Sequence, residues 1–242
     1  MSAPRTALVT GGTRGIGRAI VERLLAAGWR VHATYRHDAA AARALLAGAG
    51  PGLSVHQIDG ADAEAVAGFV QGLDADDPIG LLVNNAGQSL DQFAHQAAPA
   101  AVAALFDANV LAAMHYCRAL LPAMQRRRGG DIVNISSLAS VNVRHGNAFY
   151  GASKAALERF GAGLALEAIR FGIAVNTVAP GYVETELIAN MLTPEKKRAL
   201  LASIPARRLT AAGEIADAVE FLASRRPLLV GVVLPLGGGG HL

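Results

Sequence analysis

The chain has 242 residues, of which 52% are hydrophobic and 17% are charged, and its formal net charge is +3. This length and hydrophobic content support one sizeable core and exclude a disordered chain. The single cysteine, Cys117, excludes an internal disulfide framework and fits the reducing conditions of the cytoplasm, where we expect the protein to be.

Apolar runs and turn signals place strands and helices in strict alternation along the chain. Strands are expected at residues 6–10, 30–35, 53–59, 79–87, 131–137, 173–180 and 228–236. Helices are expected at residues 16–28, 40–48, 63–73, about 99–127, about 149–170 and 213–225. This order predicts an α/β fold, in which a doubly wound parallel sheet of about seven strands carries helices on both faces.

Residues 181–212 interrupt the alternation with GYVETEL, Pro194 and Pro205, which predicts a small helical lid over a substrate site. Elsewhere no repeat or linker divides the sequence. We therefore expect residues 1–242 to form a single domain.

The sequence also argues against a membrane, nucleic-acid or metal-binding protein. The N-terminal segment MSAPRTALVT lacks the pattern of a signal peptide, and the longest apolar stretch is interrupted by Asp107 and Arg118. The basic run 126–128 fits the end of a helix, where the helix dipole favours positive charge, and aromatic residues for base stacking are few. The histidines do not have metal-ligand spacing.

A glycine-rich turn follows the first strand directly and leads into a helix. It reads TGGTRGIG, residues 10–17, with the spacing T-G-x-x-x-G-x-G. Glycines let backbone amides approach a phosphate, and the amino end of a helix favours negative charge, so this context predicts dinucleotide binding. The simpler interpretation is a tight turn without a ligand. The expected contacts are Gly11, Thr13, Arg14, Gly15, Ile16 and Gly17.

The end of the second strand indicates which dinucleotide is bound. A carboxylate there would hold the ribose of NAD, whereas cations accommodate the extra phosphate of NADP. The strand ends with Tyr35 and Arg36, and Arg14 lies in the glycine turn, so two guanidinium groups are available for a phosphate. Asp38 is expected to cap the helix that begins at Ala39. We therefore expect NADPH or NADP+.

The stretch AFYGASKAAL places Tyr150 one helical turn before Lys154, so both side chains project from one face. In order and spacing, this pair and the motifs TGGTRGIG, NNAG at 84–87, Asn109, NISS ending at Ser137, and PGYVET resemble the short-chain dehydrogenase/reductase family over nearly the whole chain. The resemblance implies a Rossmann-type domain, hydride transfer with a nicotinamide cofactor, and usually a homotetramer, or a dimer.

The resemblance also implies catalytic roles for Asn109, Ser137, Tyr150 and Lys154. Tyr150 would donate its proton to a substrate carbonyl oxygen, and Lys154 together with the oxidised nicotinamide would lower the pKa of the phenol. Ser137, rather than Ser136, would hydrogen-bond the substrate oxygen. Lys154 would also hold the nicotinamide ribose, and Asn109 would hold a water that leads to solvent.

Further cofactor contacts are carried over from the family. Asp59 and Gly60 would border the adenine, although Gly60 replaces an apolar residue that is common there, and His145 would border the substrate cleft. The glycine-rich C-terminal end departs from the family pattern, which leaves its packing open. The remaining expected contacts are Asn85, Ala86, Gly87, Pro180, Gly181, Val183 and Thr185.

Within the family, the glycine turn with Arg14, the strand end at Arg36 and APGYVET are most similar to 3-oxoacyl-[acyl-carrier-protein] reductases. A basic rim, defined as Arg126, Arg127, Arg128 and Arg170, would attract an acidic acyl carrier protein. Two alternatives stay open: an NADP-dependent dehydrogenase of another small-molecule ketone or alcohol (a polyketide, steroid, sugar or terpenoid), and a non-catalytic nucleotide-binding member of the fold.

Overall fold

The computed structural model describes residues 5–184, 193–223 and 229–241. Its centre is a seven-stranded sheet with the order β3-β2-β1-β4-β5-β6-β9, in which every neighbouring pair is parallel. The strands are β1 Thr6–Val9, β2 Arg30–Tyr35, β3 Leu53–Gln57, β4 Leu81–Asn84, β5 Gly130–Ile135, β6 Ile173–Pro180 and β9 Val233–Leu236. The expected α/β class and parallel sheet are confirmed.

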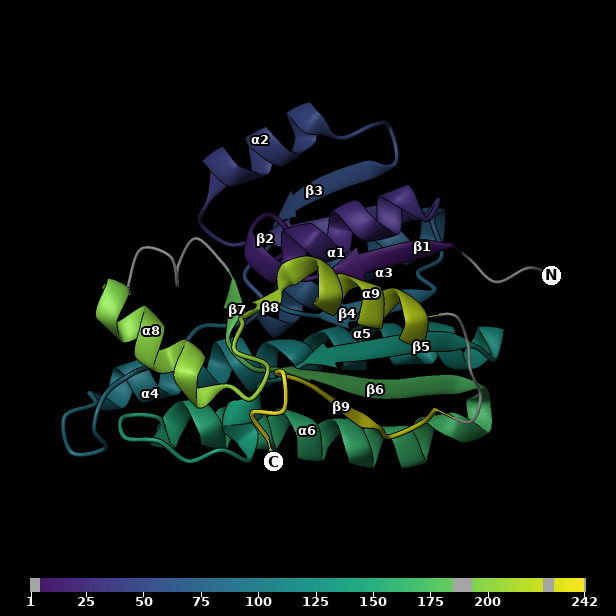
Figure 1. Cartoon of the computed structure of the whole chain (residues 1–242). Helices are drawn as coiled ribbons and strands as arrows, with labels where there is room; N and C mark the ends of the chain where they lie inside the picture. Colours follow the sequence, from purple (N-terminus) through teal and green to yellow (C-terminus); the bar gives the residue numbers. More distant parts are fainter. Residues whose placement is uncertain (1–4, 185–192, 224–228, 242) are drawn as a thin grey trace.

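Helices cover both faces of this sheet (Figure 1). They are α1 Gly15–Ala26, α2 Ala39–Gly48, α3 Ala63–Asp76, α4 Pro99–Phe106, α5 Ala112–Arg127, α6 Ala148–Ala168, α8 Pro194–Ser203 and α9 Ala212–Leu222. Successive strand residues point to opposite faces, so β1 sends Ala7 and Val9 to the core under α1 and α9, and Leu8 to the core under α3, α5 and α6. Two apolar cores therefore hold one sheet between them.

The helix expected at about 99–127 is interrupted. Between α4 and α5 lies a π-helical turn, η1 Asp107–Leu111, in which the Ala112 amide donates to the Asp107 carbonyl five residues earlier. Such turns are rare and often mark functional sites, because they turn a side chain out of regular helical register. The turn contains Asn109, one of the four predicted catalytic residues.

The run Pro99–Arg127 is long and apolar enough, by length and composition, to cross a membrane. In this fold it has the setting of a core helix, because Tyr116, Leu120 and Met124 are fully buried against α3 and the sheet. The other side of the run keeps apolar surface exposed, including Leu111.

The predicted lid contains α8 and a two-stranded pairing of β7 Val183–Glu184 with β8 Thr210–Ala211. In Figure 1, β1 begins at the right, and α4 and α8 stand at the opposite end of the molecule. Residues 185–192 of the predicted lid lie outside the described part of the chain.

The last strand is shorter than expected. Gly231 has a left-handed backbone conformation with φ of 73°, and the Asn176 side chain binds the Leu229 carbonyl and the Val232 amide. The Gly231 amide donates to the Val175 carbonyl of β6 at 2.8 Å, but the regular pairing with β6 begins only at Val233. An apolar run alone did not reveal this turn.

Candidate active site

The site lies where the direction of strand order reverses. From β1 the chain proceeds outward to β2 and β3, and from β4 it proceeds the other way to β5, β6 and β9. In open parallel sheets, ligands bind at the carboxyl ends of the strands beside such a switch point. Here the carboxyl ends of β1 and β4 bring the glycine turn and the segment 84–87 together.

The glycine turn is fixed to the end of β4 by hydrogen bonds. Thr10 Oγ1 accepts from the amides of Asn85 (3.0 Å) and Ala86 (2.9 Å), and Asn85 Nδ2 donates to the carbonyls of Thr10 (2.9 Å) and Gly11 (3.0 Å). Asn85 and Ala86 are thereby placed against the predicted cofactor turn. In this structure the Asn85 side-chain amide donates its hydrogen bonds to the backbone of the glycine turn.

Two glycines of the turn have no room for a side chain. Gly11 has φ of 62°, a conformation that favours glycine, and a Cβ there would lie 3.0 Å from Ala86 Cα. A Cβ on Gly17 would overlap the Gly11 carbonyl oxygen and lie 2.5 Å from Asn85 Nδ2. The turn is therefore built as a bare backbone cradle at the amino end of α1, which fits a pyrophosphate.

The two predicted phosphate-binding arginines differ in their surroundings. Arg14 is exposed at the start of α1, whereas the Arg36 Nε pairs with Asp59 Oδ2 at 3.0 Å. Thr13 is buried, so its part in the phosphate site stays a prediction. An incoming phosphate would thus compete with Asp59 for Arg36, a competition that spacing along the sequence did not reveal.

Gly60 has a packing reason to be glycine. A Cβ there would lie 2.9 Å from Ala112 Cβ and 3.4 Å from Tyr116 Cε2, and His115 Nδ1 lies 3.0 Å from the Gly60 carbonyl oxygen. Helix α5 therefore lies too close to admit the apolar side chain expected from the family.

The predicted catalytic residues come together at the carboxyl end of β5. Ser137 follows this strand, and its side chain lies near the hydroxyl of Tyr150, which is on the first turn of α6. Lys154 is buried one turn later; its Nζ lies 5.9 Å from the Tyr150 ring centroid and donates to the Ile135 carbonyl at 2.9 Å. The pair that the sequence places on one helical face is therefore also a pair in space.

Asn109 joins this group through η1. Its Oδ1 accepts from the Gln88 amide at 2.8 Å, and its Nδ2 donates to the Gln88 carbonyl and to Ser153 Oγ, both at 2.9 Å. Ser153 Oγ in turn donates to the Tyr150 carbonyl at 2.8 Å. Both N–H groups of the amide are thus used within the protein, and Asn109 ties the loop after β4 to the turn that carries Tyr150.

Gly87 is needed for this approach. A Cβ there would lie 2.9 Å from Asn109 Oδ1 and 3.5 Å from Lys154 Nζ. The predicted cofactor segment 84–87 therefore runs directly beside two of the predicted catalytic side chains.

The pKa of Tyr150 differs from the sequence-based prediction. Burial raises it above the ordinary tyrosine value, a hydrogen bond from Ser137 lowers it, Asp91 raises it and Arg144 lowers it. The prediction of a lowered pKa counted on two cations, of which the chain itself supplies Lys154. Burial also lowers the pKa of Lys154, to about 8. In the protein alone, burial thus keeps the Tyr150 phenol protonated.

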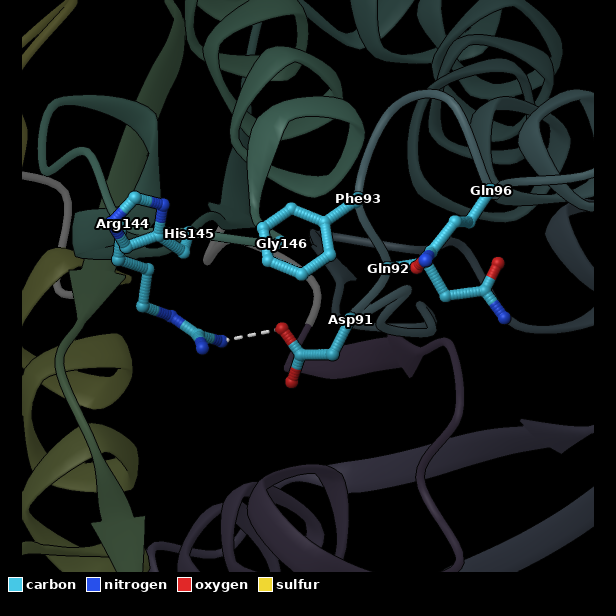
Figure 2. Close-up of a pocket in the computed structure, with 7 residues that line it drawn as sticks. All are labelled: Asp91, Gln92, Phe93, Gln96, Arg144, His145 and Gly146. Carbon is cyan, nitrogen blue, oxygen red and sulfur yellow. Dashed lines mark hydrogen bonds and ion pairs between the residues drawn. The ribbon is translucent and has the colours of Figure 1, made fainter.

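A cavity of about 390 Å³ lies between the loop after β4 and the loop before α6. Arg144 and Asp91 point toward one another across it and form an ion pair of 2.7 Å (Figure 2). The Gln92 amide donates to the Gly146 carbonyl at 3.0 Å, and Phe93 packs beside His145. His145 therefore lines this cavity, its predicted place at a substrate cleft stays a prediction, and the Asp91–Arg144 ion pair is a feature that the sequence did not reveal.

The glycine-rich C-terminal end forms part of the same region. A Cβ on Gly237 would overlap Leu138 Cδ1, beside Ser137, and one on Gly181 would lie 2.9 Å from Gly237 Cα. Asn142 Nδ2 donates to the Gly240 carbonyl at 2.6 Å. The packing of this end, which the sequence left open, thus consists of close backbone contacts. Pro180, Gly181 and Val183 lie at this edge, and Thr185 lies outside the described residues.

Comparison with known proteins supports this picture. The family model described as short chain dehydrogenase matches residues 5–196. The chain is 36% identical to 3-oxoacyl-[acyl-carrier-protein] reductase FabG of Escherichia coli (strain K12) over 98% of both chains. It is 37% identical to the acetoacetyl-CoA reductase of Shinella zoogloeoides over 97% of this chain and 98% of that one.

A solved structure described as ElxO with NADP bound has a TM-score of 0.91 to this structure and 27% sequence identity, and the match covers 98% of each chain. This agreement in sequence and fold extends across both halves of the sheet. The chain therefore belongs to the short-chain dehydrogenase/reductase family and is an oxidoreductase of that family.

Proposed function

We propose that the chain is an NADPH-dependent reductase that converts a 3-oxoacyl thioester, carried by acyl carrier protein or coenzyme A, to the 3-hydroxyacyl thioester. The observation that carries the proposal is the meeting of Ser137, Tyr150 and Lys154 beside the glycine cradle at one edge of the sheet. The names of the two similar reductases support the substrate class, because both describe 3-oxoacyl thioester chemistry.

The cradle of Gly11 and Gly17 at the amino end of α1 would hold the cofactor pyrophosphate, and Arg14 and Arg36 would hold the additional phosphate. When bound, the cofactor supplies a hydride to the carbonyl carbon. The other proposed cofactor contacts are Thr13, Gly15, Ile16, Tyr35, Asp59, Gly60, Asn85, Ala86, Gly87, Tyr150, Lys154, Pro180, Gly181, Val183 and Thr185.

In the reductive direction, the protein must supply one proton to the carbonyl oxygen. Tyr150 carries the proton for this step, because burial keeps its phenol protonated, and the predicted cations beside it, Lys154 and the oxidised nicotinamide, would lower its pKa toward the working range. Ser137, whose side chain lies near Tyr150, would hydrogen-bond the same substrate oxygen and orient it. Asn109 would fix the position of the loop after β4 relative to α6, because it hydrogen-bonds Gln88 and Ser153. The binding of a water by Asn109 stays a prediction.

The function is tested by NADPH oxidation with a panel of substrates. Acetoacetyl-CoA and a 3-oxoacyl carrier protein are expected to be reduced with kcat/KM at least 100-fold above that for cyclic ketones, keto sugars and steroids of comparable solubility. Preferred turnover of any of those other ketones would replace the proposed substrate. Absence of turnover with every ketone, despite NADPH binding, would favour the non-catalytic alternative.

The choice of NADPH over NADH is expected to depend on Arg36. An Arg36→Ala variant loses a charge-assisted bond to the phosphate, so its affinity for NADPH should fall about tenfold or more while its affinity for NADH stays within about twofold. Titration of cofactor fluorescence measures both. Trp29 is an unsuitable reporter because it precedes β2, at the opposite end of that strand from Arg36. Equal losses for the two cofactors would contradict the phosphate role.

The predicted basic rim lies near the amino ends of the strands, whereas the predicted catalytic residues lie near their carboxyl ends. Arg126 and Arg128 close α5 just before β5 begins, whereas Ser137 follows the far end of β5. Arg127 is not available for a partner, because it binds Asp74 Oδ2 at 2.7 Å and the Ile79 carbonyl at 2.8 Å. Within one subunit, the rim would therefore act on an acidic carrier protein by long-range attraction.

Arg126 and Arg128 are exposed and allow a charge-reversal test of carrier binding. The variant Arg126→Glu/Arg128→Glu is expected to lower kcat/KM for carrier-bound substrate about tenfold at low salt, with acetoacetyl-CoA turnover unchanged. Acetoacetyl-CoA is the matched control, because it reports the same chemistry without the carrier. Equal activity of variant and wild type toward carrier-bound substrate would exclude the rim as a docking surface.

We also infer that the protein acts as a homotetramer or dimer in the cytoplasm. Leu111 on η1, Leu166 on α6 and Ile169 directly after α6 are exposed apolar side chains that a second subunit would cover. Cys117 is fully buried with a pKa raised by burial to about 12, so it is an unreactive thiol suited to a reducing compartment.

A further inference from the structure

A carboxylate that the sequence did not single out lies on the same helix as Lys154. Glu158 follows Lys154 by one turn of α6, so both side chains share a face. Ser136, buried at the end of β5, donates its hydroxyl to Glu158 Oε1 at 2.6 Å and lies 3.3 Å from the Lys154 carbonyl oxygen. The carboxylate is thus held in one direction by the neighbour of Ser137.

The environment of Lys154 makes this carboxylate important. The ammonium is buried, which disfavours its charge, and its pKa falls to about 8 because burial outweighs the opposing effect of Glu158. Without the Glu158 carboxylate, the protonation equilibrium of Lys154 would move further toward the neutral amine.

The other groups around Lys154 do not replace this charge. Tyr150, on the same helix, is a protonated phenol, and η1 brings the neutral amide of Asn109. The end of β5 brings the Ile135 carbonyl, and the loop after β4 brings the backbone of Gly87. Among the described residues, Glu158 is the carboxylate whose charge stabilises the Lys154 ammonium.

We propose that Glu158 is a positioning residue that keeps Lys154 protonated beside Tyr150, and that Ser136 fixes the direction of its carboxylate. The role of Lys154 in reduction rests on the proposed function. The effect of Glu158 on the charge of Lys154 is a property of the protein alone and can be measured without cofactor or substrate.

The sequence allows a direct measurement, since its three lysines are Lys154, Lys196 and Lys197. In a Lys196→Arg/Lys197→Arg background, Lys154 is the sole lysine, and the 13Cε shift of labelled lysine reports its protonation. Glu158→Gln, which keeps the size of the side chain, is expected to lower the titration midpoint by about one pH unit. Ser136→Ala keeps the Glu158 carboxylate but removes the hydrogen bond that orients it. This variant should lower the titration midpoint of Lys154 by a smaller amount.

Glu167→Gln is the matched control, because it removes an exposed carboxylate from the same helix. It is expected to leave the titration of Lys154 unchanged, and Glu158→Asp is expected to restore most of the wild-type midpoint. An unchanged midpoint in both Glu158→Gln and Ser136→Ala would overturn the proposal. So would a shift in Glu167→Gln as large as that in Glu158→Gln.

The pH profile of reduction gives the functional readout. As the pH rises through the pKa of Lys154, the ammonium is lost, so the alkaline limb of kcat should move to lower pH in Glu158→Gln by the amount seen in the titration. If Glu158→Gln shifted the titration midpoint of Lys154 but left the alkaline limb of kcat at its wild-type pH, the positioning role would be overturned. If no ketone were reduced at all, the proposed function would fail, while the titration would still decide whether Glu158 controls the charge of Lys154.

Discussion

Replacing Tyr150 by phenylalanine is expected to lower kcat for acetoacetyl-CoA reduction by roughly 10²–10⁴-fold, the usual contribution of general acid catalysis. The substitution removes one hydroxyl and keeps the ring, so the packing of α6 against the end of β5 should be preserved. The carbonyl oxygen would then keep Ser137 as a hydrogen-bond donor but lose its proton source. Initial rates of NADPH oxidation at saturating substrate measure the effect.

Two controls separate lost chemistry from lost structure. NADPH affinity, followed by cofactor fluorescence, should stay within about threefold of wild type, because Tyr150 contributes its hydroxyl and not the phosphate contacts. Tyr182→Phe removes a hydroxyl from a tyrosine with 37% of its surface exposed and should leave kcat unchanged. A Tyr150→Phe enzyme with wild-type kcat would end the catalytic proposal, however well the other motifs agree.

The sequence predicted that the side chains of Ser137, Tyr150 and Lys154 lie close together, because two simple rules govern their positions. One helical turn separates Tyr150 from Lys154, and the carboxyl ends of parallel strands meet at one edge of a sheet. Ser137, at the end of β5, therefore had to lie near whatever α6 presents there. Local periodicity and topology were sufficient for this part of the site.

The charge balance of the site could not be predicted in this way. Asp91 and Arg144 form an ion pair across 53 residues, and Arg36 finds Asp59 through the pairing of β2 with β3. Partners of this kind depend on how loops fold over the sheet, and no period in the sequence encodes them. In the protein alone, burial raises the pKa of Tyr150, and burial is a property of the whole fold; the predicted lowering of this pKa counted on bound cofactor as well as Lys154 and stays a prediction.

The packing of the glycine-rich C-terminal end is a second feature that the sequence alone did not predict. The departure of the C-terminal end from the family pattern was visible in the sequence, but its packing was not. In the structure, Gly238 and Gly239 adopt left-handed conformations with φ of 57° and 86°, and Gly237 lies against Leu138 and Gly181. These glycines allow the tail to approach the substrate side of the site closely.

Substituting Gly17 by alanine is expected to have the largest effect on cofactor binding. The added Cβ would overlap the carbonyl oxygen of Gly11, which is backbone and cannot turn aside, and would lie 2.5 Å from the Asn85 amide that holds the turn to β4. The turn must therefore move, and the cradle for the pyrophosphate would be lost. We expect NADPH affinity to fall about 100-fold or more, and the free energy of unfolding to fall by about 1–3 kcal/mol, as for overpacked cores.

Gly68→Ala is the matched control, because Gly68 lies on the exposed side of α3 and a Cβ there would meet nothing within 4 Å. Alanine is favoured over glycine inside a helix by about 1 kcal/mol, so this variant should be as stable as wild type or slightly more stable, with unchanged NADPH affinity. Urea unfolding and fluorescence titration measure the two quantities. NADPH affinity in Gly17→Ala within threefold of wild type would mean that the cofactor does not sit on this turn, since the overlap at Gly17 leaves the backbone no way to keep its present shape.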